Sequence, residues 1–124
     1  MELRIKKKEC IEGTVRVPGD KSISHRSIML ASLAKGVTRI KGFLMSEDCL
    51  ATIGCFKSMG IKIEVEPKKV LVHGKGLDGL REPQDVLDIG NSGTTIRLLA
   101  GILAGQPFTA IVTGDQSIRR RPMG

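Results

Sequence analysis

The sequence has no tryptophan or tyrosine and only three phenylalanines among its 124 residues. Proteins that bind single-stranded nucleic acid stack bases on aromatic side chains, and this sequence has little material for such a surface. It also has no run of about 20 apolar residues, the length that a membrane-spanning helix needs. Residues 1–4 lack the apolar core of a signal peptide and the basic, acid-poor composition of a transit peptide. These absences predict a cytoplasmic protein that binds neither nucleic acid nor membranes.

Cysteine and histidine are scarce and do not form a ligand pattern. Cys10, Cys49 and Cys55 form no Cys-x-x-Cys pair, and His25 and His73 stand apart from any cysteine cluster. Structural zinc sites use four closely spaced ligands of these types, so we predict no metal site. The cysteines are interpreted as reduced, mostly buried thiols. The simplest interpretation of His25 is a satisfied surface histidine.

Positive charge is the abundant feature. Lysine and arginine number 20 against 13 aspartates and glutamates, which gives a formal charge of +7 at pH 7. With 40% hydrophobic and 27% charged residues, the composition is that of a globular chain. A basic balance favours anionic partners, but it does not choose among nucleic acid, a membrane surface and phosphorylated metabolites.

The first part of the sequence alternates predicted strands and helices. Residues 3–6 and 13–17 alternate apolar and polar side chains, which is typical of half-buried strands. A helix is expected over about 24–35, with Gly36 available for a left-handed C-terminal cap. A third strand follows over 37–43.

A second helix and a hairpin complete this unit. Ser46 has the character of an N-cap, and acidic residues follow it in the positive first turn of the helix. Gly60 ends that helix. Residues 61–66 and 70–73, separated by the turn 67–69, predict a β-hairpin. The order is therefore β-α-β-α-β-β over the first unit.

The same order begins again and breaks off. A strand is expected over 86–89, a helix over 92–103 and a strand over 109–113. The segments 30–42 and 99–114 share a helix end, a glycine-bearing turn and a strand. An internal repeat that stops in mid-unit predicts a fragment of a longer protein, whose unpaired strand edges favour aggregation when it is alone.

The chemistry lies at equivalent strand-to-helix junctions. The junction at 17–27 offers the ammonium of Lys21, the hydroxyls of Ser22 and Ser24, and the planar guanidinium of Arg26. In α/β units, ligands bind where strands end and helix N-termini point free N–H groups outward.

Two further elements are expected at the same end of the fold. The junction at 90–95 carries Gly93, whose missing Cβ lets the backbone approach a ligand. The basic run 119–121 follows the strand 109–113. Each element alone is more often a solvated cap, a plain turn or a charged surface, and 90–95 is neither a Walker loop nor a Gly-x-Gly-x-x-Gly fingerprint. Their equivalent placement favours a site for a small molecule with several negative charges.

Three stretches resemble one family. "PGDKSISHRSIMLASLAKG" (18–36), "GNSGTTIRLLAGILAG" (90–105) and "GDQSIRRRPM" (114–123) are similar to the N-terminal part of 5-enolpyruvylshikimate-3-phosphate (EPSP) synthases. The sister family, UDP-N-acetylglucosamine enolpyruvyl transferase, has asparagine after the lysine, where this sequence has Ser22. The resemblance covers essentially the whole sequence but only the first quarter to third of such an enzyme.

The resemblance implies an activity and a set of ligands. Members transfer the enolpyruvyl group of phosphoenolpyruvate to the 5-hydroxyl of shikimate 3-phosphate, release phosphate and need no cofactor; the step belongs to the shikimate route to chorismate and aromatic amino acids. By motif, Lys21, Ser22 and Arg26 would bind shikimate 3-phosphate. Lys21, Gly93 and Arg121 would bind phosphoenolpyruvate or the competing herbicide glyphosate.

The resemblance also implies an organisation. The family has an inside-out α/β barrel fold of two domains, each built from three β-α-β-α-β-β units, of which about one and a half would lie here. Residues 1–17 would belong to the second domain and 18–124 to a partial N-terminal domain, with a first unit over 18–80 and an incomplete second unit over 81–124. No catalytic residue falls in this part, so the fragment is expected to be inactive without the missing C-terminal part of the enzyme.

Two non-enzymatic alternatives stay open from the residues. One is a basic nucleic-acid-binding module, which the net charge of +7 permits. The other is an isolated anion-binding or split-protein module whose role is association with a partner chain.

Overall fold

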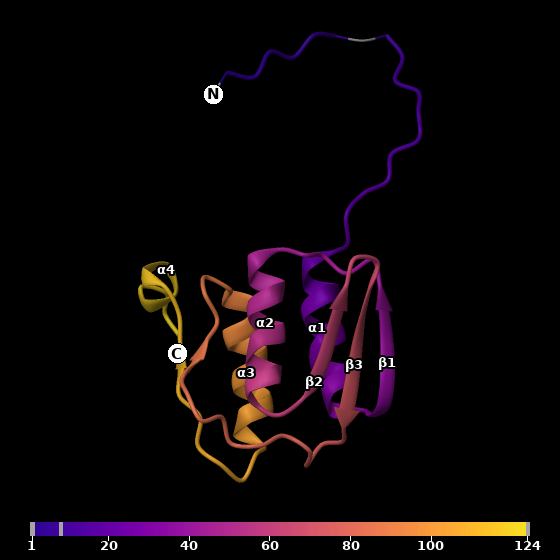
Figure 1. Ribbon diagram of the computed structural model, residues 1–124. Helices are drawn as coiled ribbons and strands as arrows, with labels where there is room; N and C mark the ends of the chain where they lie inside the picture. The colour runs from indigo at the N-terminus through magenta and orange to yellow at the C-terminus, as the bar shows by residue number, and fades with distance from the viewer. Residues whose placement is uncertain (1, 8, 124) are drawn as a thin grey trace.

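The computed structural model describes residues 2–7 and 9–123 as a mixed α/β fold, as expected. Four helices and five strands are formed within these residues (Figure 1). In sequence order they are α1 Lys21–Leu33, β1 Lys35–Lys41, α2 Glu47–Ser58, β2 Lys62–Glu66, β3 Lys69–Lys75, β4 Leu87–Asp88, α3 Gly93–Ala104, β5 Val112–Thr113 and α4 Gln116–Arg119.

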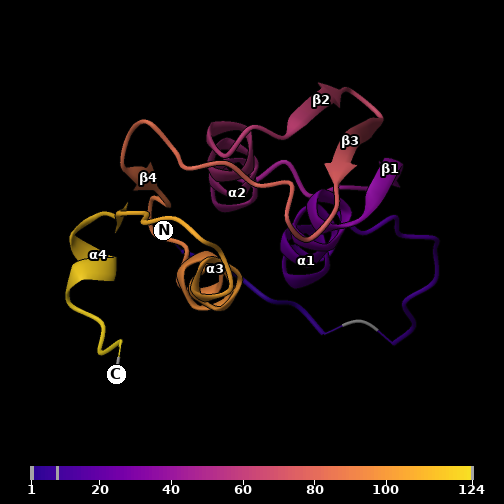
Figure 2. The ribbon, with the colours of Figure 1, turned by 90° about the horizontal axis from the view of Figure 1, so that it is seen from below.

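The first three strands form an antiparallel sheet in the order β1-β3-β2. The predicted hairpin is confirmed as β2 and β3, and β3 extends to Lys75 because Lys75 pairs with Lys35 of β1. Helices α1 and α2 lie against one face of this sheet (Figure 2). The apolar side chains between the two layers include Ile28, Phe56 and Val72, each with no measurable exposure.

The second part of the chain forms a β-α-β unit. Strands β4 and β5 are parallel, with Leu87 opposite Val112 and Asp88 opposite Thr113, and α3 makes the connection between them. The core continues into this unit through Leu99 of α3, which is fully buried. Helices α1, α2 and α3 start at the same end of the molecule, and α4 lies at that end beyond α3 (Figure 1).

The predicted strands 3–6 and 13–17 are not formed, and this prediction is wrong. Residues 2–7 and 9–20 have no regular structure and lead away from the sheet (Figure 1). Their apolar side chains are exposed, from 76% at Val17 to 91% at Ile11. Alternation of side chains only makes a segment suitable for a half-buried strand; a sheet edge must also supply hydrogen-bond partners, and neither described sheet pairs with these residues.

The boundaries of the first helix also differ from the prediction. Helix α1 begins three residues earlier, because Asp20 is its N-cap and accepts a hydrogen bond from the Ile23 N–H at 2.7 Å. It ends at Leu33, where Ala34 turns to an extended conformation and leads into β1. Gly36 has a positive φ of 97° but lies within β1, so its predicted role as a helix cap is wrong.

The limits of the second helix are confirmed. Ser46 is the N-cap of α2 and accepts from the Cys49 N–H, and acidic residues occupy the first turn. Gly60 follows the helix with a φ of 86°, in the left-handed region where glycine is favoured. Helix α4 was not predicted, because one turn of helix is too short to show a periodic pattern.

The burial of the cysteines gives a testable difference in reactivity. Cys49 and Cys55 are buried and Cys10 is exposed. Burial raises the pKa of the Cys55 thiol to about 11, and burial also raises the pKa of Cys49. Since the thiolate is the reactive form, we expect a disulfide reagent at pH 8 to modify one thiol quickly in the native chain and three after denaturation. Fast reaction of all three native thiols would contradict the buried positions.

Candidate anion-binding cleft

The cleft lies where the first three helices start. Each start is closed by a side-chain cap: Asp20 for α1, Ser46 for α2 and Ser92 for α3. The Ser92 hydroxyl accepts from the Thr95 N–H at 3.1 Å. The first N–H groups of a helix have no acceptor inside it, and the helix dipole makes this end positive. The three starts therefore create a positive end of the fold before any side chain is counted.

An open cleft of about 520 Å³ occupies this end. Its lining residues come from α1, α2, the turn before α3, α3 itself and the segment that begins with α4: Lys21, Asp48, Asn91, Gly93, Thr94, Arg97, Ser117 and Arg121. The structure thus brings together one residue from each of the three predicted elements, Lys21, Gly93 and Arg121. What these residues bind stays a prediction at this point.

The charges in the cleft are mixed but predominantly positive. Lys21 forms an ion pair with Asp48, whose side chain is only 12% exposed. Arg97 lies one helical turn after Gly93 and donates a hydrogen bond from Nη2 to the carbonyl oxygen of Pro122 at 3.3 Å. Three cations and one carboxylate leave the cleft with an excess of positive charge, which suits an anion.

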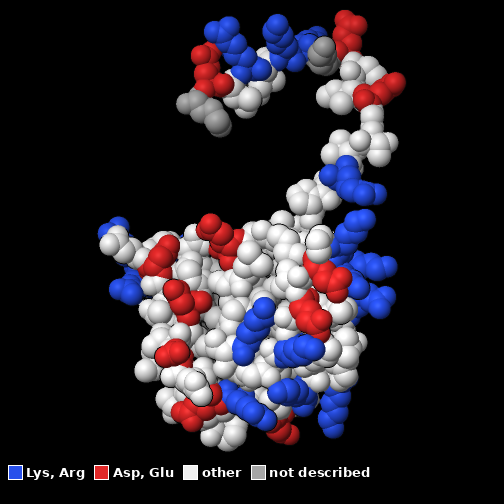
Figure 3. All heavy atoms as spheres, viewed as in Figure 1, with Lys and Arg blue, Asp and Glu red and all other residues white. Residues whose placement is uncertain are grey.

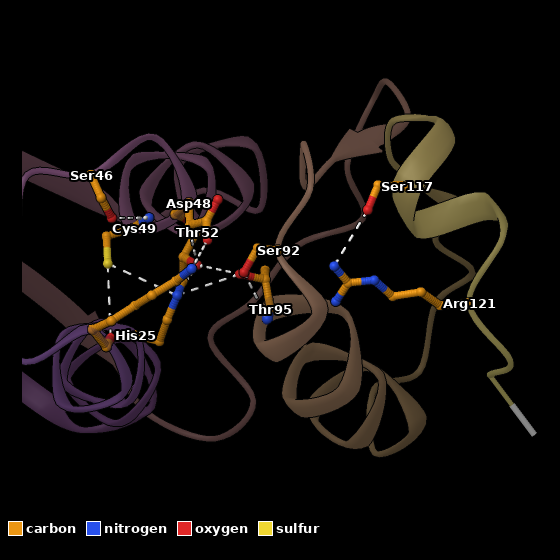
Figure 4. A network of polar contacts seen from close by, with 10 residues as sticks. His25, Ser46, Asp48, Cys49, Thr52, Ser92, Thr95, Ser117 and Arg121 are labelled. Atoms are coloured by element: carbon orange, nitrogen blue, oxygen red, sulfur yellow. Dashed lines mark hydrogen bonds and ion pairs between the residues drawn. The ribbon is translucent and has the colours of Figure 1, made fainter. Parts of the chain in front are cut away.

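Gly93 and Arg121 are in direct contact. A Cβ added to Gly93 would lie 2.6 Å from Arg121 Nη1, which is too close for a real pair of atoms. Arg121 Nη2 also lies 3.3 Å from the Ser117 hydroxyl oxygen, to which it donates (Figure 4). The glycine therefore lets the guanidinium lie against the start of α3.

Ser22 and Arg26, the other two residues that the family resemblance assigned to a substrate, do not line this cleft. They lie one turn apart on α1, on the stripe next to the one that carries Lys21. Consecutive helical residues are about 100° apart, so a ligand of Ser22 and Arg26 would meet α1 from a different side. Arg26 is exposed and Ser22 half-buried. Their binding role stays a prediction.

Ser24 has a structural role instead of the predicted ligand-binding one. Its side chain is 3% exposed. The hydroxyl donates to the Asp20 carbonyl oxygen at 2.7 Å and accepts from the Leu44 N–H at 3.0 Å. These bonds join the start of α1 to the segment before α2, and leave Ser24 away from the cleft.

The three arginines of the run 119–121 likewise differ in whether they line the cleft. Arg119 donates from Nε to the Gly114 carbonyl oxygen at 3.0 Å and from Nη2 to the Thr113 hydroxyl at 3.4 Å, so it fastens α4 to the end of β5. Arg120 is exposed and lies outside the cleft. Only Arg121 of the three lines it.

The interpretation of His25 as a surface histidine is wrong. Its ring is fully buried between helices and lies 2.7 Å from the Thr52 hydroxyl (Figure 4). Burial lowers the pKa of His25, a shift that the Asp48 carboxylate opposes and the Lys21 ammonium reinforces. The spacing of Lys21 and His25, one helical turn apart, was visible in the sequence. The burial of the His25 ring was not, because it depends on how α1 and α2 pack.

Sequence reasoning also missed several lining residues. Asp48 was interpreted only as an acidic residue in the first turn of a helix, because its pairing with Lys21 joins distant parts of the chain. Arg97 gave a weak signal, since it lies one turn of helix after the predicted site residue Gly93. Ser117 gave none, because α4 was not predicted.

Positive charge is not confined to the cleft. Lysine and arginine side chains gather over the outer side of the sheet (Figure 3). The exposed ones on or beside its strands are Lys35, Arg39, Lys41, Lys62, Lys68 and Lys75. Within residues 2–7 and 9–123, no group of three or more His, Cys, Asp or Glu is arranged to hold a metal ion. Over the same residues, no helix has the length and apolar character to cross a membrane.

The fold and the cleft together define an α/β protein with a cationic, solvent-open site at the N-termini of its helices. Comparison with known families narrows this class. The family model described as EPSP synthase (3-phosphoshikimate 1-carboxyvinyltransferase) matches residues 5–124. The chain therefore belongs to the EPSP synthase family, as its motifs indicated.

Individual relatives agree with this assignment. The 3-phosphoshikimate 1-carboxyvinyltransferase of Alkaliphilus metalliredigens is 63% identical over 94% of this chain, and that of Desulforamulus reducens is 60% identical over 99%. The solved structure of EPSP synthase from Acinetobacter baumannii superposes with a TM-score of 0.85 at 50% identity, over 90% of this chain and 26% of its own. The chain spans only 28% and 29% of the two curated relatives.

Proposed function

We propose that this chain forms the N-terminal part of an enzyme that transfers the enolpyruvyl group of phosphoenolpyruvate to the 5-hydroxyl of shikimate 3-phosphate. The hydroxyl oxygen bonds to C2 of phosphoenolpyruvate, the bond between C2 and the phosphate oxygen breaks, and the phosphate leaves with the proton of the hydroxyl. The observation that carries the proposal is the cleft in which Lys21, Gly93 and Arg121 meet at the helix starts. A positive helix end and a planar guanidinium are well suited to phosphate and carboxylate groups.

In this proposal the two substrates meet at Lys21. Phosphoenolpyruvate, or glyphosate in its place, would bind Lys21, Arg121 and the backbone at Gly93. Shikimate 3-phosphate would bind Lys21, Ser22 and Arg26 from the neighbouring side of α1. The separate stripes of the helix that carry Lys21 and the Ser22–Arg26 pair support two ligands side by side. No cofactor takes part in this scheme.

The proposal also covers the parts of the enzyme beyond this chain. Because the chain spans less than a third of its curated relatives, we propose that catalysis requires the remainder of the enzyme. We further propose that residues 18–80 and 81–124 are the first unit and part of the second unit of an inside-out α/β barrel, with residues 1–17 belonging to the other domain. A cytoplasmic location stays an expectation of the sequence.

Calorimetric titration of the chain with shikimate 3-phosphate tests the substrate assignment, with Arg26→Ala as the comparison. We expect saturable binding in the unchanged chain and its loss in the variant, because Arg26 is exposed and its replacement leaves the core intact. Equal binding by both proteins would contradict the role of Arg26. Absence of heat from a well-folded chain would contradict a preformed site and leave an association module as the better description.

A further inference from the structure

A buried hydrogen-bond network connects the starts of the three helices behind the cleft. It consists of His25 on α1, Thr52 on α2, Thr95 on α3 and Ser92, the N-cap of α3, and is called the buried network below (Figure 4). We propose that the buried network is a positioning device: a neutral His25 that carries its proton on Nδ1 holds the Ser92–Gly93 turn, and so Gly93, in place at the cleft. The ligand-binding part of this inference rests on the proposed function.

The distances and burial make the network continuous. His25 Nδ1 lies 2.7 Å from Thr52 Oγ1, which lies 2.8 Å from Thr95 Oγ1, which lies 2.6 Å from Ser92 Oγ. All four side chains are at most 1% exposed. Among the described residues, no buried side-chain nitrogen or oxygen lacks a hydrogen-bond partner. A fully satisfied buried network of this kind favours one arrangement of the helices over others.

The direction of the hydrogen bonds follows from counting protons, starting at Ser92. Ser92 Oγ accepts from both the Thr95 N–H and the Thr95 hydroxyl. The single proton of the Thr95 hydroxyl is then used, so Thr95 Oγ1 accepts from Thr52. The Thr52 proton is used in turn, and Thr52 Oγ1 accepts from Nδ1–H of His25. The geometry therefore assigns the proton of the ring to Nδ1.

The contact of the opposite nitrogen of the ring does not choose between the tautomers. Nε2 of His25 lies 3.9 Å from Cys49 Sγ, but the thiol also donates to the Lys21 carbonyl oxygen at 3.8 Å, so the sulfur can either share its proton with Nε2 or accept from Nε2–H. The other contact of Thr52 Oγ1, to the Asp48 carbonyl oxygen, is longer at 3.3 Å and does not displace the Thr95 bond. Burial disfavours the charged ring and lowers the pKa of His25.

Each helix presents a cleft residue one turn or less from a member of the network. Lys21 precedes His25 by four residues, Asp48 precedes Thr52 by four, and Gly93 lies between Ser92 and Thr95. Residues four apart on a helix lie on the same side. A bond lost within the network would therefore release the helix starts with respect to one another and move the cleft residues that they carry.

The tautomer is tested directly by nitrogen NMR of the full chain with ¹⁵N-labelled histidine. We expect the His25 signals of a ring protonated at Nδ1, unchanged in the presence or absence of a ligand. Thr52→Val removes the acceptor of that proton while keeping the side-chain shape, and is expected to shift the tautomer equilibrium toward Nε2–H. A native ring protonated at Nε2 would overturn the inference.

The positioning role is tested at Gly93 with Thr95→Val. Ser32→Ala is the matched control, because Ser32 is also fully buried but donates only to Ile28 of its own helix, at 2.7 Å. We expect a changed chemical shift and faster hydrogen exchange of the Gly93 amide in Thr95→Val, near-native values in Ser32→Ala, and recovery in Thr95→Ser, which restores the hydroxyl. Equal Gly93 signals in Thr95→Val and the unchanged chain would overturn the inference.

Ligand binding separates this inference from the proposed function. With phosphoenolpyruvate as the probe, we expect Thr95→Val to weaken binding about 2- to 30-fold, the range of coupling through packed networks, and Thr95→Ser to restore it. Binding that is unchanged in Thr95→Val would overturn the positioning role. If the unchanged chain does not bind phosphoenolpyruvate, the proposed function fails in this chain. The His25 tautomer measurement and the Gly93 amide measurements still test the positioning role of the buried network.

Discussion

Replacing Arg121 with alanine is expected to weaken binding of phosphoenolpyruvate to the cleft by about 10- to 100-fold, the effect of removing a charge-assisted hydrogen bond. The guanidinium lies against Gly93 and is held by the Ser117 hydroxyl at 3.3 Å. Its removal takes away the cation on the α4 side of the cleft and leaves Lys21 and Arg97 on the other side. Isothermal titration of the variant and the unchanged chain measures the effect.

Arg120→Ala is the matched control for this experiment. Arg120 is the neighbour of Arg121, carries the same charge and is likewise exposed, but it lies outside the cleft. Its loss changes the net charge equally, so a general electrostatic effect would appear in both variants and would fade with salt. Similar losses of affinity in the two variants would refute a specific role of Arg121.

The second large effect is expected on stability. Phe56 lies on α2 and is fully buried between that helix and the rest of the core. Phe56→Ala is expected to lower the free energy of unfolding by about 3–5 kcal/mol, because it removes apolar contacts and leaves a cavity. A domain of this size is stable by only about 5–15 kcal/mol, so urea denaturation followed by circular dichroism should show a large shift of the midpoint.

Leu50→Ala on the same helix gives the reference. Leu50 is 42% exposed, so its replacement also introduces an alanine into α2 but removes much less packing. A loss below about 1 kcal/mol is expected there, in the range of partly exposed sites. Equal losses at Leu50 and Phe56 would mean that α2 is not packed as described.

Local signals in the sequence were sufficient for features that depend on neighbouring residues. The start of α2 at Ser46, its end before Gly60 and the hairpin that follows were predicted from caps, a glycine and alternation. Each of these is decided within a few residues by hydrogen bonds to the backbone or by allowed dihedral angles. The motifs at 18–36 and 90–105 likewise indicated the family before the fold was known.

Features that depend on distant partners were not predictable in this way. The alternation of 3–6 and 13–17 describes an amphipathic segment but contains no information on whether a sheet edge accepts it. The burial of His25 arises where α1, α2 and α3 meet, and the pairing of Lys21 with Asp48 joins two helices. Such contacts are set by tertiary packing, which overrides what a short window of sequence indicates.

The segment before α1 has a further consequence for solutions of this chain. Its alternate apolar side chains, such as Leu3, Ile5 and Val15, are 79–86% exposed, and the backbone of residues 2–7 and 9–20 forms no pairing with either sheet. A segment of this kind is a donor strand without an acceptor. A sheet edge of matching register, including one on a second molecule, can accept this segment as an additional strand. If two molecules exchange their segments reciprocally, each segment covers the open sheet edge of the other molecule and a dimer results.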